Sequence, residues 1–167
     1  TSNMSLIGAE VANAKQVVMI SPTASTGDLS GLDDFFLRTA AVSSDEALQL
    51  AKASVQEFGI DKIAVIYDSS NAAYSKTWIE YYSKGVEESG GVIQPLVSFD
   101  SGSDTAYLAL ATEVLATEPD GIAIVASAAD TSMFCQQFHK LGNTALILGS
   151  GWGRSLSVLE LGGDSVE

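Results

Sequence analysis

Cysteine, histidine and proline are scarce in this chain of 167 residues, which contains one Cys, one His and three Pro. Because Cys135 is alone, no internal disulfide is possible, although this does not exclude the periplasm. One Cys and one His on a single predicted helix do not make a closed metal site. A catalytic triad would have to use His139, and no serine lies in a G-x-S-x-G elbow. The sequence therefore predicts no metal, no cofactor and no serine hydrolase.

Basic residues are also few, with 8 Lys and Arg against 21 Asp and Glu and a formal net charge of −13. Nucleic acid requires a basic surface, so we expect no nucleic-acid partner and no binding to an anionic membrane surface. No apolar run reaches the length of a membrane span. The chain starts at Thr1 without a signal peptide, so we expect a fragment trimmed at both ends.

Phosphate-binding loops of the Walker and dinucleotide types are missing as well. The glycine-rich segment 149–153 follows a predicted strand, but it has neither the spacing nor the lysine of a nucleotide site. Asp68 follows a strand as the acceptor of a receiver domain would, yet the last strand offers no lysine. Without a nucleophile–base pair or a metal cluster, a doubly wound enzyme is disfavoured. We therefore expect a protein that is not an enzyme.

Helical and apolar segments alternate regularly from residue 43 onward. The predicted helices are 43–57, 75–89, 103–117, 130–141 and a short one at 155–161. The predicted strands are 62–67, 92–99, 121–126 and 145–148. Strict alternation with apolar strands indicates parallel strands joined by right-handed crossovers. The predicted fold class is α/β, a three-layer α/β/α sandwich with a mainly parallel sheet.

A smaller α–β piece precedes this alternation. The apolar spacing predicts a helix over 3–14, a strand over 17–20 and a further β-like segment or crossover over 35–39. In the irregular segment between the last two we expect a helical turn near 31–34.

The helix predicted at 43–57 begins with a capping-box pattern. Ser43 would cap the first turn while Glu46, three residues later, folds back onto the chain. Its inward face would carry Leu48, Ala51, Val55 and Phe58. The helix predicted at 103–117 would be capped by Ser103 and Asp104 in the same way.

Hydroxyl, amide and aromatic side chains follow the ends of the predicted strands. They are Thr23, Ser25 and Thr26 after one strand, Asn71 and Tyr74 after a second, Ser127 and Asp130 after a third, and Ser150 and Trp152 after a fourth. Ligands of open α/β sheets bind outside the carboxyl ends of the strands. Aromatic faces with a few hydroxyls suit a small polar or anionic ligand.

These positions also have structural interpretations. The segment 21–27 is rich in residues that populate any turn. Tyr74 suits an aromatic at a helix start that packs on the sheet, and Trp152 suits a loop residue that plugs the core. Asp130 suits a plain N-cap. The residues alone leave both interpretations open.

Five short motifs occur in one order along nearly the whole chain: ISPTAST at 20–26, FFLRT at 35–39, KIAVIYD at 62–68 followed by Tyr74, PDG at 119–121 and GGDSVE at 162–167. In this order they resemble the type I substrate-binding proteins of ABC transporters, specifically the branched-chain amino-acid-binding (Leu/Ile/Val) group. The resemblance implies a periplasmic-binding-protein-like fold of type I, with two lobes, three hinge crossovers and a ligand cleft between the lobes.

The resemblance also implies how the chain divides. Residues 1–40 would be the C-terminal part of lobe 1 with a hinge crossover, and residues 41–167 would be lobe 2, a Rossmann-like α/β unit. About the first third of a full-length protein and its C-terminal portion would lie outside the chain.

Particular ligand contacts follow from the resemblance. Ser2, Thr23 and Ser25 would hold the ligand carboxylate, and Tyr74 would be the aromatic contact of lobe 2. The next contact falls near Ser127, where small residues replace an aromatic of some family members. The acid that pairs with the ligand amine falls near 151–152, and the sequence has no acid there.

This departure bears on the ligand, an amino acid or a related small carboxylate. A buried ammonium group without a carboxylate partner is strongly destabilised, so an α-amino acid requires a substitute acid, for which Asp130 or Asp68 is a hypothesis. Small residues near 126–128 together with Trp152 would instead make room for a larger or aromatic carboxylate.

The implied partner is the membrane permease of an ABC transporter. The implied location is periplasmic or otherwise extracytoplasmic, as a membrane-anchored lipoprotein in a Gram-positive cell. The alternative function is a ligand-sensing domain of a receptor or transcription regulator with the same fold. Lacking most of lobe 1, the chain is expected to bind ligand weakly or not at all. Its exposed lobe 1 edge is expected to favour a dimer by strand pairing.

Overall fold

The computed structural model describes residues 1–166. Glu167, the last residue of the predicted second part, lies outside this range. The helices are α1 (Ser2–Lys15), α2 (Ser43–Gln56), α3 (Ala72–Glu88), α4 (Tyr107–Leu115), α5 (Ala128–Lys140) and α6 (Leu156–Gly162). The strands are β1 (Met19–Ser21), β2 (Phe36–Arg38), β3 (Lys62–Asp68), β4 (Val92–Phe99), β5 (Gly121–Val125) and β6 (Leu146–Gly149).

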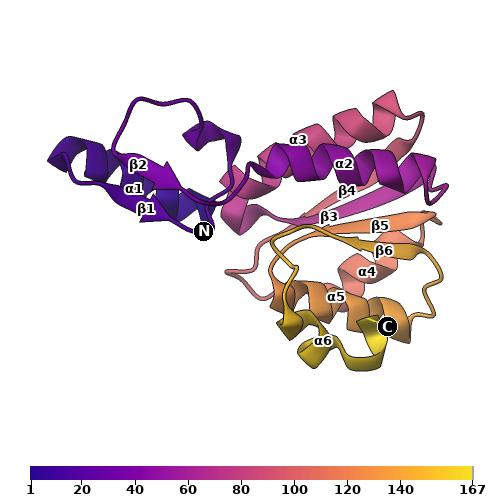
Figure 1. Ribbon diagram of the computed structural model, residues 1–167. Coiled ribbons are helices and arrows are strands. Elements are labelled where there is room, and N and C mark those ends of the chain that lie inside the picture. The colour runs from indigo at the N-terminus through magenta and orange to yellow at the C-terminus, as the bar shows by residue number, and fades with distance from the viewer. Residues whose placement is uncertain (167) are drawn as a thin grey trace.

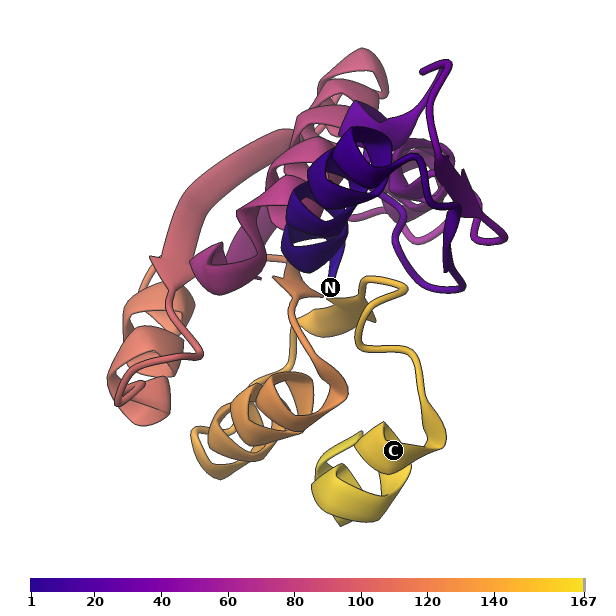
Figure 2. The same cartoon turned by 90° about the vertical axis from the view of Figure 1, so that its left-hand side faces the viewer.

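Strands β3 to β6 form a parallel sheet in the order β4-β3-β5-β6. Helices α2 and α3 cover one face of this sheet, and α4 and α5 cover the other (Figure 1). Figures 1 and 2 agree in placing α6 beside α5, on the side of the sheet away from α2 and α3. The predicted α/β/α sandwich with a parallel sheet is therefore confirmed. We call residues 41–166 the sandwich.

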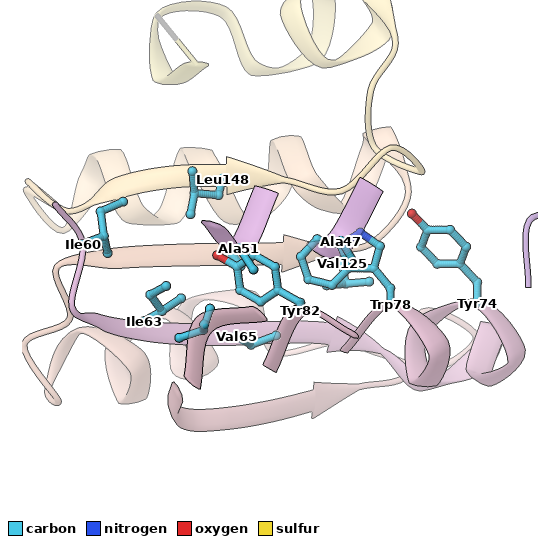
Figure 3. Close-up of a cluster of buried hydrophobic side chains, with 12 residues drawn as sticks. Ala47, Ala51, Ile60, Ile63, Val65, Tyr74, Trp78, Tyr82, Val125 and Leu148 are labelled. Atoms are coloured by element: carbon cyan, nitrogen blue, oxygen red, sulfur yellow. The ribbon is translucent and has the colours of Figure 1, made fainter. Parts of the chain in front are cut away.

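The middle of β3 (63–66) and the whole of β5 are apolar because helices cover both faces of the sheet. Ile63 and Val65 of β3 point to α2 and α3, whereas the alternate residues Ala64 and Ile66 point to α4 and α5. Figure 3 shows the cluster beneath α2 and α3, in which the aromatic residues of α3 lie in a row. Two of these rings, Trp78 and Tyr82, stack with centroids 4.5 Å apart. This cluster fixes α3, and with it the position of Tyr74 at the end of the row.

Helix α1 and strands β1 and β2 form a separate, thin unit, which we call the N-terminal segment (residues 1–40). The two strands pair in parallel as a two-stranded sheet. Its small core consists of Ala9, Ala24, Leu29 and Phe36. Many of its other apolar side chains are exposed, including Ile7, Val11, Ile20 and Leu37. Among the described residues no helix is long and apolar enough to cross a membrane.

The predicted capping box at the start of α2 is wrong. The N-cap is Val42, which makes no side-chain cap hydrogen bond, and Ser43 is the first helical residue. The hydroxyl of Ser43 instead donates to the carbonyl oxygen of Ser25, at 3.1 Å. Because a tertiary contact uses this hydroxyl, Glu46 is not drawn back into a cap.

Other differences lie at the ends of elements. Phe58 is 54% exposed, because α2 ends before it and Gly59 turns the chain at a φ of +67°. Helix α4 begins only at Tyr107, since the hydroxyl of Ser103 donates to the carbonyl oxygen of Asp100 rather than capping the helix. The helical turn expected near 31–34 occurs earlier, as a 3₁₀ turn at Gly27–Leu29.

Candidate functional site

The start of α1 and the start of α3 are joined by hydrogen bonds from one side chain. The amide nitrogen of Asn3 donates to the carbonyl oxygen of Ser70, and its side-chain oxygen accepts from the backbone N–H of Ala73, both at 2.8 Å. Its own backbone N–H donates to Oδ1 of Asn71 at 3.3 Å. These bonds bring Ser2 close to the first turn of α3, the turn that carries Tyr74.

The loop after β1 connects the N-terminal segment to both helices on one face of the sandwich. The carbonyl oxygen of Ser25 accepts from the backbone N–H of Ser43 at 2.9 Å, at the start of α2. The hydroxyls of Thr26 and Thr77 are 3.4 Å apart, which links the loop to α3. The loop therefore lies where α1, α2 and α3 all begin.

The predicted carboxylate contacts lie together in this loop and at the start of α1. The backbone N–H of Ser25 donates to the hydroxyl of the buried Ser2 at 3.4 Å. The hydroxyl of Ser21 accepts from the backbone N–H of Ala24 at 3.1 Å and holds the turn, which leaves Thr23 exposed at its tip. Ser2 and Ser25 thus lie together at the N-terminus of α1, where an anion is stabilised, whereas Thr23 is bonded through its backbone N–H to Ser21 in its own turn.

Tyr74 and Trp152 meet directly. The backbone N–H of Trp152 donates to the Tyr74 hydroxyl oxygen at 3.2 Å, and the two rings pack edge to face with centroids 5.5 Å apart. Burial raises the pKa of Tyr74 to about 12, so the phenol stays neutral. In Figure 3 its ring lies at the outer end of the core cluster. The packing role of both residues is confirmed, because each ring packs on the core cluster, and their contact with a ligand stays a prediction.

The loop after β6 is tightly packed around Trp152. Ser150 is 1% exposed, and its hydroxyl has no hydrogen-bond partner within residues 1–166. A Cβ atom at Gly153 would lie 2.8 Å from Oγ1 of Thr131, so only glycine fits without a shift there. An unpartnered buried hydroxyl is costly unless something else satisfies it.

Ser127 and Asp130 are placed on the other side of the sheet from Tyr74. Ser127, not Asp130, is the N-cap of α5, and it accepts from the backbone N–H of Asp130. The Asp130 carboxylate accepts from the hydroxyl of Ser127 through Oδ2 and from that of Tyr107 through Oδ1, at 2.7 Å. Burial and this carboxylate raise the pKa of Tyr107 to about 12. Asp130 thus joins α4 to α5, and the N-cap interpretation of Asp130 is wrong.

Asp68 has a structural role of the same kind. It is 1% exposed, and its carboxylate accepts hydrogen bonds from the backbone N–H and the hydroxyl of both Ser70 and Ser101. Burial by itself would raise the pKa of Asp68, but these four bonds outweigh it and hold the pKa below the ordinary value. The carboxylate ties the loop after β3 to the loop after β4, so neither of its oxygens is free for a ligand.

A hollow of about 980 Å³ lies between α5, β6 and α6, and Ser150 of the loop after β6 is part of its lining. Cys135 and His139 line one side of it. Burial raises the pKa of the Cys135 thiol to about 11, so it is protonated and a poor nucleophile near neutral pH. Within residues 1–166 no group of His, Cys, Asp and Glu side chains is arranged to hold a metal ion.

Glu46 is the residue that sequence reasoning missed. Its carboxylate reaches from the first turn of α2 to the loop after β6, where a Cβ atom at Gly151 would lie 2.9 Å from Oε1 and closer still to Oε2. The pattern pointed to a helix cap, and only the contact of Ser43 with the N-terminal segment releases Glu46 from that role. The sequence signal for this arrangement is Gly151, because a residue without a Cβ atom leaves room for another side chain.

Solved structures of solute-binding proteins share this fold. The leucine-binding protein LivK of Thermotoga maritima superposes with a TM-score of 0.88 at 26% identity, over 98% of this chain and 46% of that one. A solute-binding protein of an ABC transporter from R. palustris, in complex with benzoate, superposes with a TM-score of 0.87 at 14% identity, over 98% and 45% of the two chains. Another, from Rhodopseudomonas palustris BisB5 with 3,4-dihydroxybenzoic acid, gives a TM-score of 0.83 at 17% identity, over 95% and 43%.

The chain therefore spans less than half the length of these structures. No curated protein sequence matches it significantly. The family model of the periplasmic binding proteins matches residues 1–167, the whole chain. The chain belongs to the periplasmic binding protein family.

Proposed function

We propose that the chain is part of the extracytoplasmic solute-binding component of an ABC uptake transporter. It binds an amino acid or a related small carboxylate in a cleft between two lobes, without enzymatic activity, and delivers it to a membrane permease. Residues 1–40 belong to lobe 1 and its hinge crossover, and residues 41–167 belong to lobe 2. The length of the solved relatives, about twice that of this chain, supports this division.

The observation that carries the proposal is the meeting of two different surfaces at one edge of the sheet. The N-terminal segment contributes uncharged hydrogen-bond donors at Ser2, Thr23 and Ser25. The sandwich contributes the aromatic pair of Tyr74 and Trp152. Donors on one side and aromatic area on the other suit a small molecule with an anionic end and an apolar body.

The ligands named for the solved relatives fit this arrangement. Leucine, benzoate and 3,4-dihydroxybenzoic acid each have one carboxyl group and an apolar body. A common carboxylate contact in the N-terminal segment would serve all of them, and the aromatic pair would contact the part of the ligand that differs.

Ligand-observed saturation-transfer NMR with L-leucine and with benzoate tests the proposal. We expect binding weaker than micromolar, because this chain has only part of lobe 1. Thr23→Val and Ser25→Ala should each weaken both probes by about three- to tenfold, the effect of one lost hydrogen bond. Thr39→Val, which removes an exposed hydroxyl in the same segment, is the matched control and should change nothing. Saturation transfer that neither Thr23→Val nor Ser25→Ala reduces would contradict the proposal.

A further inference from the structure

The carboxylate of Glu46 lies against the loop after β6, next to the aromatic pair of the proposed site. It extends from α2 over Gly151, where the lack of a Cβ atom leaves room for it. The Glu46 carboxylate also lies near the Tyr74 hydroxyl. Burial is the main cause of the raised pKa of Tyr74, and the negative charge of Glu46 raises it further. The Glu46 side chain from α2 therefore occupies the space that a side chain at position 151 would fill.

This carboxylate has no partner of its own among residues 1–166. It accepts no hydrogen bond, and the ion pair that the structure contains joins Lys84 to Glu88 on the surface of α3. Arg154 lies close enough to the Tyr74 hydroxyl to influence it but does not form an ion pair with Glu46. A half-buried carboxylate without a counter-charge is unfavourable unless a cation joins it.

The groups around Glu46 favour a cation of a particular kind. The ring pair of Tyr74 and Trp152 offers aromatic faces, which attract an ammonium group. The buried Ser150 hydroxyl has no hydrogen-bond partner within residues 1–166, so its oxygen is free to accept one. A carboxylate, aromatic faces and a free hydroxyl oxygen are acceptors for a primary ammonium.

We infer that Glu46 binds the ammonium group of a zwitterionic α-amino acid. The inference rests on the proposed function and makes Glu46 a specificity-determining residue of the same site. The N-terminal segment supplies donors for the carboxylate of the ligand, and the sandwich supplies acceptors for its amine. This polarity selects an amino acid over a simple carboxylic acid such as benzoate.

Two probes that differ by one amino group test the inference. L-Leucine and 4-methylpentanoate share the carboxylate and the side chain, and only leucine carries the ammonium. Chemical-shift titration of the ¹⁵N-labelled chain should show tighter binding of leucine. Glu46→Gln should weaken leucine by about tenfold, as expected for a lost charged hydrogen bond. It should leave 4-methylpentanoate unchanged or slightly tighter, because a negative charge has been removed.

Two further variants separate this role from a structural one. Gly151→Ala should displace the Glu46 carboxylate through its Cβ atom and should weaken leucine alone, by about three- to tenfold. Asp45→Asn removes the same charge from the same turn of α2, at an exposed position, and should affect neither probe.

The outcomes distinguish the two proposals. If the unmodified chain binds both probes equally, or if Glu46→Gln weakens both equally, the ammonium contact is wrong and the carboxylate site stands. Equal weakening would mean that Glu46 only holds the loop after β6, for instance through Arg154. If both probes bind but neither Thr23→Val nor Ser25→Ala weakens them, the carboxylate site of the proposed function is wrong and the inference fails with it.

Discussion

Isoleucine side chains are exposed in the N-terminal segment but fully buried in the centre of the sandwich. Ile7 and Ile20 of the N-terminal segment are 59% and 62% exposed, whereas Ile63 and Ile122 of the sandwich are 0% exposed. The sandwich has helices on both faces of its sheet, so every central strand is covered. The N-terminal segment has one helix on a two-stranded sheet, which leaves its other surfaces uncovered.

Several hydrogen bonds join the two regions. They run from Asn3 to the start of α3, from Ser25 to Ser43, and from Thr26 to Thr77. Polar contacts between units are typical of surfaces that move relative to each other. The sandwich is therefore stabilised by its own core, whereas the N-terminal segment depends on hydrogen bonds at its boundary with the sandwich. The proposed site lies at this same boundary.

The largest effect should come from the core of the sandwich. Trp78→Ala removes a fully buried ring and should lower the free energy of unfolding by about 3–5 kcal/mol. Ile7→Ala, at an exposed position of α1, should change it by less than about 0.5 kcal/mol. Urea denaturation followed by circular dichroism measures both. Similar losses at the two positions would show that the regions are stabilised alike.

A smaller loss is expected at Asp68, which stabilises the loops of the sandwich through hydrogen bonds rather than apolar contacts. Asp68→Asn should lower the free energy of unfolding by about 1–3 kcal/mol at neutral pH, because the charged hydrogen bonds are lost. Asp104→Asn, an exposed acid in the nearby loop, is the control and should have no effect.

The contribution of Asp68 also depends on pH. Its pKa is lower in the folded chain than the ordinary value of 3.8, so the ionised form stabilises the fold above that value. This stabilisation disappears as the pH falls from 3.8 through the lower pKa of the folded state. The unmodified chain and Asp68→Asn should therefore converge in stability on acidification, and a constant difference down to pH 2 would contradict the assignment.

The boundary between the regions should respond to Asn3. Asn3→Ala removes two side-chain hydrogen bonds and should increase amide hydrogen exchange in α1 by about tenfold, leaving β3 and β5 unchanged. Glu10→Ala, at an exposed position of the same helix, should not alter exchange. Faster exchange throughout the sandwich would mean that the two regions unfold as one unit.

The smallest effect concerns association. The free edge of β1 and the exposed apolar side chains beside it are expected to favour dimers at high concentration. Ile20→Lys should suppress them without changing the stability of the sandwich. Sedimentation velocity over a range of concentrations measures this, and a monomer at every concentration would contradict the expectation.

The elements of the sandwich could be predicted because their sequence signals are local. Continuous apolar runs predicted β3 and β5, and the glycines at 59, 90 and 91 marked the ends of α2 and α3. Parallel topology predicts that the residues after these strands lie at one edge of the sheet, but not that Ser127 and Asp130 lie at the start of α5, on the other face from Tyr74. The same topology predicts that Tyr74 and Trp152 lie close together, although they are 78 positions apart in the sequence.

The partners of individual side chains could not be predicted. Ser43 has the pattern of a helix cap, but a long-range contact with Ser25 takes its hydroxyl. Asp130 follows a strand, but Tyr107 from another helix takes one of its oxygens. Residue spacing does not show such competition between local and tertiary hydrogen bonds. The competition explains why Glu46, and not Asp130 or Asp68, has a free carboxylate at the proposed site.

The most direct test of the central claim is a map of where a carboxylate ligand binds. The claim is that the two regions form one site at their boundary. Titration of the ¹⁵N-labelled chain with L-leucine should shift the amide signals of Ser2 and Ser25 together with those of Tyr74 and Trp152, with one dissociation constant. Shifts confined to the hollow between α5 and α6, or to only one of the two regions, would contradict it.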